Sequence, residues 1–219
     1  MSSEDIIKMT KLFPKCNLIY SYGLTEASPR VTYIMGLDLL KKIGSSGIPI
    51  KNVKVEIANK ERDNSGEIVV SGPNVMLGYY NDVERTKKVI VDGKLYTGDY
   101  GYIDNDGYLY VFGRKDNMII SAGKNIYPEE IEDKLNNMPY ISESIVIEKE
   151  GKLVALIYPD FDLVNEEKIT DEKLDELMTA NLKEINQQLP AYSQLNTYKL
   201  YNEEFEKTPK RSIKRFLYQ

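Results

Sequence analysis

The periodicity of apolar and polar positions differs from one part of the chain to the next. Residues 3–13 begin at a capping Ser3, carry acids early and place apolar residues at helical spacing, which predicts an opening helix. Residues 17–20 form a short apolar run that predicts a strand, and a polar loop over residues 22–26 comes just after it. Loops that follow strands in open α/β sheets are where ligands usually dock, so this loop is a candidate site.

From about Gly44 to Gly113 the pattern is that of short strands. Residues 53–57 alternate, residues 67–70 are a short apolar run, and residues 107–111 follow an Asp-Asn-Asp-Gly turn. Short strands separated by turn signals predict a compact β-barrel-like or sandwich subdomain.

After Arg114 the rhythm changes again. Pro128 stands near the start of a segment with acids in its first turn and helical spacing beyond, which predicts a helix up to Leu135. Further strands and one long helix are predicted at residues 141–148, 153–159, 171–189 (the helix) and 197–200. The chain is therefore predicted to be α+β, with a β-barrel-like subdomain followed by a compact α+β domain. The polar pair Lys115–Asp116 separates the two patterns, and we place the boundary there, between residues 1–114 and 115–219.

Composition narrows the function. The formal net charge is −5, with both signs mixed along the chain, which favours neither a nucleic acid nor an anionic membrane as partner. No apolar run approaches the roughly 20 residues that span a bilayer. The single cysteine cannot form an internal disulfide, so we expect a cytoplasmic, reducing environment. Histidine is absent, which excludes Ser-His-Asp and Cys-His devices and His-ligated zinc.

Four motifs carry candidate chemistry. The loop Tyr22-Gly23-Leu24-Thr25-Glu26 offers an aromatic face, a hydroxyl and a carboxylate, which suit a purine, a phosphate and Mg²⁺. The later motifs add a carboxylate, a guanidinium and a loop glycine, and they are Tyr96-Thr97-Gly98-Asp99, Gly113-Arg114-Lys115-Asp116 and Gly123-Lys124-Asn125-Ile126-Tyr127-Pro128-Glu129-Glu130-Ile131-Glu132. Taken singly, Asp99 and Gly123 are also compatible with ordinary turn residues.

In order and spacing these motifs resemble the adenylate-forming superfamily, which includes acyl-CoA synthetases, peptide-synthetase adenylation domains and luciferases. Within this superfamily, the residues of the motifs at 22–26 and 126–132 are most similar to those of the acyl-CoA ligases. The resemblance implies that Tyr22 lies against adenine, Thr25 on the α-phosphate and Glu26 on a metal. It further implies that Asp99 accepts both ribose hydroxyls and that Arg114 contacts the ribose or phosphate. Asp116 then corresponds to the hinge of a mobile C-terminal domain, and Gly123 to a loop lining the thiol tunnel.

The C-terminal segment departs from that family. The family ends in a loop of the form Thr-Pro-x-Gly-Lys-Ile-x-Arg, whose Lys bridges the carboxylate substrate and the phosphate. This chain reads Thr208-Pro209-Lys210-Arg211-Ser212-Ile213-Lys214-Arg215, so an ungapped alignment puts Ser212 at the catalytic Lys position. Loss of a cation there costs orders of magnitude in rate, so adenylation is expected to be impaired unless Lys210 or Lys214 substitutes.

The resemblance also implies that the chain corresponds to the second half of such an enzyme, without its Gly/Ser/Thr-rich phosphate loop or the neighbouring strands of its large sheet. We then expect the opening strand to lack neighbours, and an N-terminal half or a second copy to cover residues 1–21 around Ile6, Ile7, Leu12, Phe13, Leu18 and Ile19.

The expected function is part of an ATP-dependent acid–CoA ligase that acts through an acyl-adenylate, with ATP or AMP, Mg²⁺, CoA and a carboxylic acid as ligands. The alternatives are a non-catalytic nucleotide- or partner-binding module and an inactive fragment.

Overall fold

The computed structural model describes residues 3–61, 64–121, 123–209 and 211–219. It divides into two compact units, Met1–Asp116 and Asn117–Gln219. Within the described residues, no helix combines the length and the apolar composition needed to cross a bilayer.

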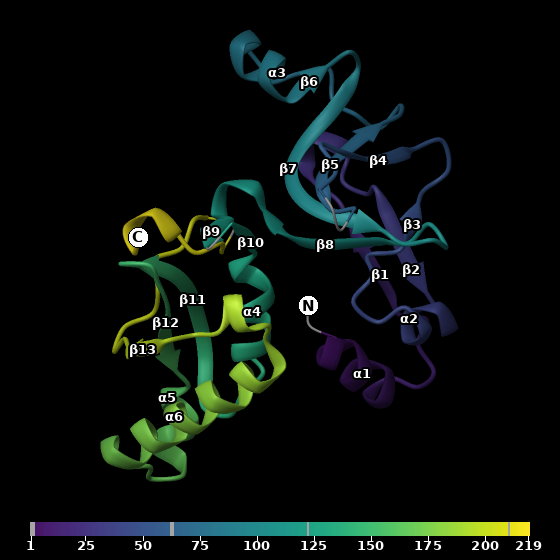
Figure 1. Cartoon of the computed structure of the whole chain (residues 1–219). Coiled ribbons are helices and arrows are strands. Elements are labelled where there is room, and N and C mark those ends of the chain that lie inside the picture. Colours follow the sequence, from purple (N-terminus) through teal and green to yellow (C-terminus); the bar gives the residue numbers. More distant parts are fainter. Residues whose placement is uncertain (1–2, 62–63, 122, 210) are drawn as a thin grey trace. The chain divides into compact units, whose positions relative to one another are not determined.

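Unit 1 opens with the predicted helix, α1 (Ser3–Leu12), followed by a small antiparallel sheet in the order β1-β2-β3 (Figure 1). The strands are β1 (Ile19–Tyr22), β2 (Thr32–Met35) and β3 (Ile48–Pro49), with the short helix α2 (Leu37–Lys41) after β2. Buried Ile6, Ile34 and Leu39 form the core between these helices and strands.

Three sequence expectations are corrected in this part of unit 1. The first strand begins and ends two residues later than predicted, because its partner strand fixes the register, pairing Ile19 with Met35 and Tyr22 with Thr32. That pairing also shows that the strand does have a neighbour. Ile6, expected on the covered surface, is only 3% exposed because it packs into the local core.

One face of this sheet remains apolar and exposed. Ile19, Tyr33, Met35 and Ile48 are 56%, 36%, 43% and 40% exposed. Ile19 lies opposite Met35 and Tyr33 opposite Ile48, so the four side chains share one side of the sheet. We call this surface the outer face of β1–β3.

The rest of unit 1 is a five-stranded antiparallel sheet, which forms the expected barrel-like subdomain as half of a barrel. The path is β4-β5-β7-β6, with β8 also paired to β7, which curves strongly in Figure 1. The elements are β4 (Lys54–Ala58), β5 (Gly66–Ser71), α3 (Val83–Val89), β6 (Ile90–Val91), β7 (Lys94–Ile103) and β8 (Leu109–Arg114). Val55, Ile68, Val70, Leu95 and Leu109 fill its core.

Unit 2 is the compact α+β domain. After the hairpin β9 (Ile119–Ser121)–β10 (Lys124–Ile126) comes α4 (Pro128–Leu135), whose proline is at the helix start as predicted. A second sheet has the order β11-β12-β13, with β13 parallel to β12. Its elements are β11 (Ile141–Lys149), β12 (Lys152–Pro159), α5 (Phe161–Glu166), α6 (Asp171–Gln188) and β13 (Thr197–Leu200). Fully buried Ile131, Leu135, Ile157, Met178 and Ile185 hold α4 and α6 on the sheet.

Candidate functional site

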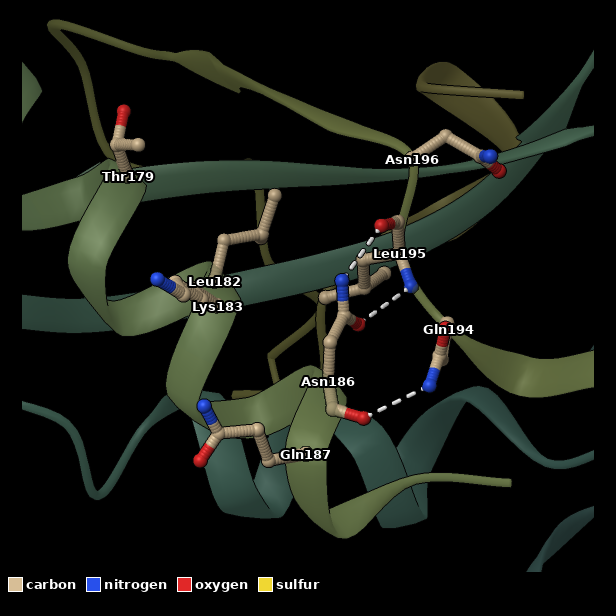
Figure 2. Close-up of a pocket in the computed structure, with 8 residues that line it drawn as sticks. All are labelled: Thr179, Leu182, Lys183, Asn186, Gln187, Gln194, Leu195 and Asn196. Carbon is tan, nitrogen blue, oxygen red and sulfur yellow. Dashed lines mark hydrogen bonds between the residues drawn. The ribbon is translucent and has the colours of Figure 1, made fainter. Parts of the chain in front are cut away.

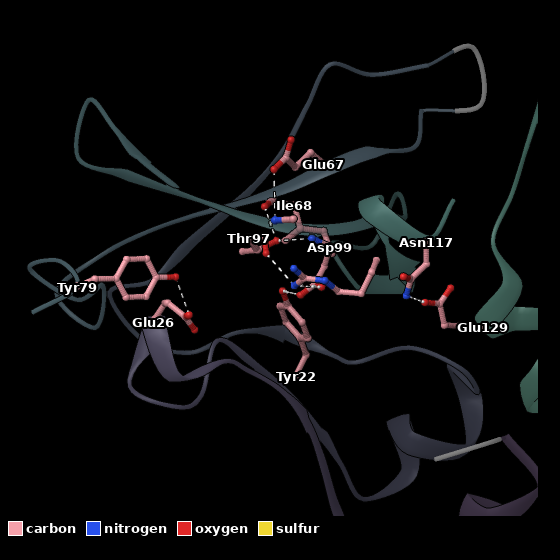
Figure 3. Close-up of polar contacts among 11 residues, drawn as sticks. Tyr22, Glu26, Glu67, Ile68, Tyr79, Thr97, Asp99, Asn117 and Glu129 are labelled. Atoms are coloured by element: carbon pink, nitrogen blue, oxygen red, sulfur yellow. Dashed lines mark hydrogen bonds and ion pairs between the residues drawn. The ribbon is translucent and has the colours of Figure 1, made fainter. Parts of the chain in front are cut away.

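The centre of the candidate site is a hydrogen bond between two motifs that are far apart in the sequence. Tyr22, at the end of β1, donates its hydroxyl to Oδ2 of Asp99 on β7, at 2.6 Å (Figure 3). Burial, and then the charge of Asp99, raise the pKa of Tyr22 well above its ordinary value. The phenol therefore stays protonated and acts as a donor to the carboxylate.

Arg114 completes this cluster from the neighbouring strand. Asp99 and Arg114 are direct partners in the β7–β8 register. The guanidinium Nη1 lies 3.0 Å from Oδ1 of Asp99 and donates to the carbonyl of Thr97 at 3.1 Å. Asp99 is thus bonded through both carboxylate oxygens, and its side chain is only 14% exposed.

Gly98 is needed for that arrangement. Its φ is +71°, a left-handed conformation that glycine adopts without steric cost. A Cβ at this position would lie 3.1 Å from Nη2 of Arg114. The glycine of the Thr-Gly-Asp motif therefore gives the arginine room beside Asp99.

Glu26 and Thr25 lie on the short 3-10 turn Thr25–Ala27 that follows β1. Thr25 is exposed, whereas Glu26 is half-buried and accepts a 2.8 Å hydrogen bond from the hydroxyl of Tyr79 at Oε1. Figure 3 draws this pair together with the Tyr22–Asp99 contact.

The single carboxylate of Glu26 suits one kind of metal site. Among the described residues, no group of three or more Asp, Glu, Cys or His side chains could enclose an ion. Mg²⁺ commonly binds through one or two carboxylates together with substrate phosphates and water. Glu26 therefore fits an ion that arrives with a nucleotide and does not fit a metal caged by the described side chains alone.

Glu67 ties the Asp99 loop to the end of unit 1. Its carboxylate accepts from the backbone N–H of Gly98 at 3.2 Å and from Nζ of Lys115 at 2.9 Å. The Glu67 side chain is only 8% exposed. Lys115 directly precedes Asp116, the proposed hinge residue, which is exposed in the turn Lys115–Asn117.

Gly123 belongs to unit 2, in the turn between β9 and β10. Its φ is +71°, and a Cβ there would meet nothing within 4 Å. The position therefore favours glycine for backbone conformation and is sterically open. Nearby, Asn117 donates its side-chain amide to Glu129 at the start of α4 (Figure 3).

The C-terminal loop places Ser212 in an exposed turn. Its N–H donates to Oγ1 of Thr208 at 3.3 Å, and its carbonyl accepts from the N–H of Thr208 at 2.8 Å. Lys214 is engaged elsewhere, with Nζ 3.0 Å from Glu206. Lys210, the other candidate substitute, lies outside the described residues.

An ion pair anchors that loop to the domain. Arg215 pairs with Glu132 of α4, and both side chains are largely buried, at 17% and 8% exposed. Glu132 also accepts from the N–H of Val146 at 2.6 Å. Burial raises the pKa of Glu132, while Arg215 and the Val146 N–H act in the opposite direction.

A surface groove in unit 2 involves none of the predicted site residues (Figure 2). It measures about 420 Å³ and lies between α6 and the segment 194–196. Asn186 bonds the backbone of Leu195 through both its amide atoms, at 2.8 Å each. These contacts fix the chain leading into β13, so the amide of Asn186 has a structural role.

The sequence analysis predicted that Tyr22, Asp99 and Arg114 belong to one site. In the structure, Asp99 is bonded to both Tyr22 and Arg114. The sequence analysis gave Tyr79 no part in the site and so missed the contact with Glu26. It gave Glu67 no part either, and so missed the contacts with Gly98 and Lys115. No local spacing indicates these contacts, because they join segments that meet only through the fold.

Comparison with known proteins places these features in a family. The family described as "AMP-binding enzyme" matches residues 1–80, and "AMP-binding enzyme C-terminal domain" matches residues 115–218. The 2-succinylbenzoate–CoA ligase of Bacillus cytotoxicus is 40% identical over 162 residues, covering 70% of this chain and 33% of the relative. The corresponding ligase of Oceanobacillus iheyensis is 46% identical over 143 residues, covering 64% and 30%.

Solved structures of related ligases also match this chain. The o-succinylbenzoate CoA synthetase of Bacillus subtilis in complex with an acyl-adenylate intermediate matches with a TM-score of 0.80 and 26% identity, over 100% of this chain and 44% of that one. The same enzyme with ATP and magnesium ion matches with a TM-score of 0.77 and 28% identity, over 96% and 43%. The chain spans about a third of the length of the curated relatives it matches.

Proposed function

Because the chain belongs to the adenylate-forming AMP-binding enzymes, we propose that it is part of an ATP-dependent ligase that joins a carboxylic acid to CoA through an acyl-adenylate. The observation that carries the proposal is the cluster of Tyr22, Asp99 and Arg114, built by strands β1, β7 and β8. These are the three side chains that the family resemblance assigns to a bound nucleoside.

The chemistry of the cluster suits a ribose. A carboxylate accepts hydrogen bonds from two neighbouring hydroxyls, and Asp99 presents both oxygens from a fixed strand position. Arg114, already beside Oδ1, supplies a cation for the sugar or the α-phosphate, and the exposed Thr25 supplies a hydroxyl. A ribose diol replaces the Tyr22 hydroxyl on Asp99, which leaves the Tyr22 ring to contact the base.

ATP or AMP, Mg²⁺ and CoA are the ligands of this proposal. Glu26 would hold a bound Mg²⁺, which would supply positive charge to neutralise the phosphates. Gly123, in a sterically open turn, lies in the loop proposed to line the path of the thiol. Residues 1–114 provide the nucleotide-binding face, and residues 115–219 form the domain that turns about Asp116.

We also propose that the remainder of the ligase, or a second copy, covers the outer face of β1–β3. Four exposed apolar side chains on one side of a sheet support this. Replacing Ile19 and Met35 by Lys should lower the mass of the native particle if this face is an interface. An unchanged mass, with a more soluble monomer, contradicts it.

A second candidate function is a non-catalytic nucleotide-binding module, or an inactive fragment. Arg211 has a φ of +63°, at the position where the family motif has Gly or Arg. This supports the ungapped register and hence Ser212 at the lysine position. Lys214 is held by Glu206, so it is not poised to replace that lysine. On this reading the chain binds AMP without forming an adenylate.

AMP titration tests the nucleotide site in both readings. We expect saturable AMP binding, followed by calorimetry or by tyrosine fluorescence, and its loss in Asp99→Ala. Exposed Asp116→Ala is the matched control and should bind as the parent chain does. Equal binding by the Asp99→Ala variant contradicts the assignment. Incubation with ATP and a panel of carboxylic acids, with and without the N-terminal part of a related ligase, then separates ligase from binding module.

A further inference from the structure

The carboxylate of Glu26 is held at one oxygen only. Tyr79 donates its hydroxyl to Oε1 at 2.8 Å. Within the described residues, Oε2 has no hydrogen-bond partner in the protein. The contact joins two segments 53 residues apart, and its donor lies in the loop after β5.

The same loop fixes the backbone around Glu26. The N–H of Met76 donates to the carbonyl of Glu26 at 2.8 Å. The side-chain amide of Asn74 donates to the carbonyls of Ala27 and Arg30 at 3.0 and 3.1 Å. The segment 74–79 therefore holds the main chain and the carboxylate of this motif together.

Tyr79 is itself held in place by residues of α3. The N–H of Tyr79 donates to Oγ1 of Thr86 at 2.8 Å. The guanidinium of Arg85 lies 4.0 Å from the centre of the Tyr79 ring, within the range of a cation–π contact. Both residues belong to α3, so the ring is placed by a helix and its hydroxyl is aimed at Glu26 (Figure 3).

The neighbouring tyrosine shows that this placement is specific. Tyr80 is 93% exposed, whereas the Tyr79 hydroxyl is engaged with Glu26. Packing alone does not require a hydroxyl at position 79, since a phenylalanine ring would fill the same space. What the hydroxyl adds is one fixed hydrogen bond to a carboxylate.

We propose that Tyr79 is a positioning residue for Glu26, which holds Oε1 so that Oε2 is presented to the divalent cation carried by a nucleotide. This inference rests on the metal role of Glu26 in the proposed function. Partners of a metal-binding carboxylate commonly fix its orientation, and their loss typically costs about 10- to 100-fold in metal affinity.

The test uses the chain labelled for NMR, with Tyr79→Phe compared to the matched control Tyr80→Phe. In the free protein, we expect the side-chain order parameter of Glu26 to fall in Tyr79→Phe and to stay unchanged in the control. In the presence of AMP, Mn²⁺ should broaden the amide signals of Glu26 and Ala27. About tenfold more Mn²⁺ should be needed in Tyr79→Phe, at an unchanged melting temperature.

The outcomes distinguish the positioning role of Tyr79 from the metal-binding role of Glu26. Equal Glu26 order and equal Mn²⁺ dependence in Tyr79→Phe overturn the positioning role. If Glu26→Gln alone abolishes the broadening, the proposed metal role of Glu26 stands without Tyr79. If the parent chain binds AMP but Mn²⁺ never broadens these signals, the metal role fails and this inference fails with it.

Discussion

Tyr22 and Asp99, 77 residues apart, share a 2.6 Å hydrogen bond. The bond uses one of the two carboxylate oxygens that a ribose diol would need, and Arg114 already occupies the other. In the free chain the cluster is therefore satisfied internally. A bound nucleotide must therefore replace an existing hydrogen bond to Asp99, because both carboxylate oxygens already have partners.

Tyr22→Phe is predicted to bind AMP more tightly than the parent chain. The ring remains for the base, while the hydroxyl that competes for Oδ2 of Asp99 is gone. Since a hydrogen bond to a charged group contributes about 1.5–3 kcal/mol, a gain of roughly 10- to 100-fold is expected. Calorimetric titration measures it, with Tyr22→Leu as a control that also removes the ring. Weaker binding by Tyr22→Phe would mean that the hydroxyl contacts the nucleotide.

Gly98→Ala is predicted to weaken AMP binding and to destabilise unit 1 by about 1–2 kcal/mol, from the left-handed backbone and the crowding of Arg114. Gly93→Ala is the matched control, because its φ of +73° is similar and a Cβ there meets nothing within 4 Å. Urea unfolding should show a larger loss for Gly98→Ala. Equal losses would assign the whole effect to backbone strain.

The Glu56 pair network gives a pH prediction. Hydrogen bonds from Lys94 and then Lys54 lower the pKa of Glu56 from 4.5 to about 2. A lowered folded-state pKa means that the stabilisation is complete above about pH 4.5 and is lost as the pH falls toward 2.

The stability difference between the parent chain and Glu56→Gln should therefore shrink over that pH window. It should also shrink with added salt, because these side chains are partly exposed. Denaturant unfolding at each pH checks both effects, and a difference that grows on acidification contradicts the assignment.

Arg215→Met is predicted to destabilise unit 2 by about 3–5 kcal/mol, because it leaves the buried Glu132 carboxylate without its cation. Lys214→Met breaks the more exposed pair with Glu206 and should cost less than about 1 kcal/mol. Replacing Glu132 as well, by Gln, should recover part of the loss. Equal effects of the two single changes would show that burial does not distinguish these pairs.

Ser212→Lys tests the lysine register. In the presence of the N-terminal part of a ligase, adenylate formation should rise by orders of magnitude if position 212 occupies the catalytic position. Pyrophosphate release measures the rate. Arg211→Lys, one residue earlier, is the control and should have little effect. No gain from Ser212→Lys would place the required cation elsewhere.

Much of the fold follows from pattern alone, because the signals are local. The proline and acids before Leu135 mark α4, and the long periodic segment from Asp171 gives α6. The short strands β2, β9 and β10 were not predicted. A strand of three or four residues is too short to show a period in hydrophobicity, and it forms only by pairing with another strand. The two-residue displacement of β1 has the same origin.

The candidate site divides in the same way. Residues named by a motif, such as Asp99 and Arg114, could be identified because the motif states residue type and spacing. Tyr79 and Glu67 act through residues that they meet only after folding. A sequence reading can recognise a ligand-facing side chain, whereas its supporting partners require coordinates.

Glu67 carries one consequence for sequence variation. Its buried carboxylate holds both the N–H of Gly98 and the ammonium of Lys115. Substitutions at positions 67 and 115 are therefore expected to be epistatic, with the loss of one partner making the other dispensable or harmful. Among naturally diverging copies of this chain, these two positions should change together, while Gly98 should tolerate little change on either background.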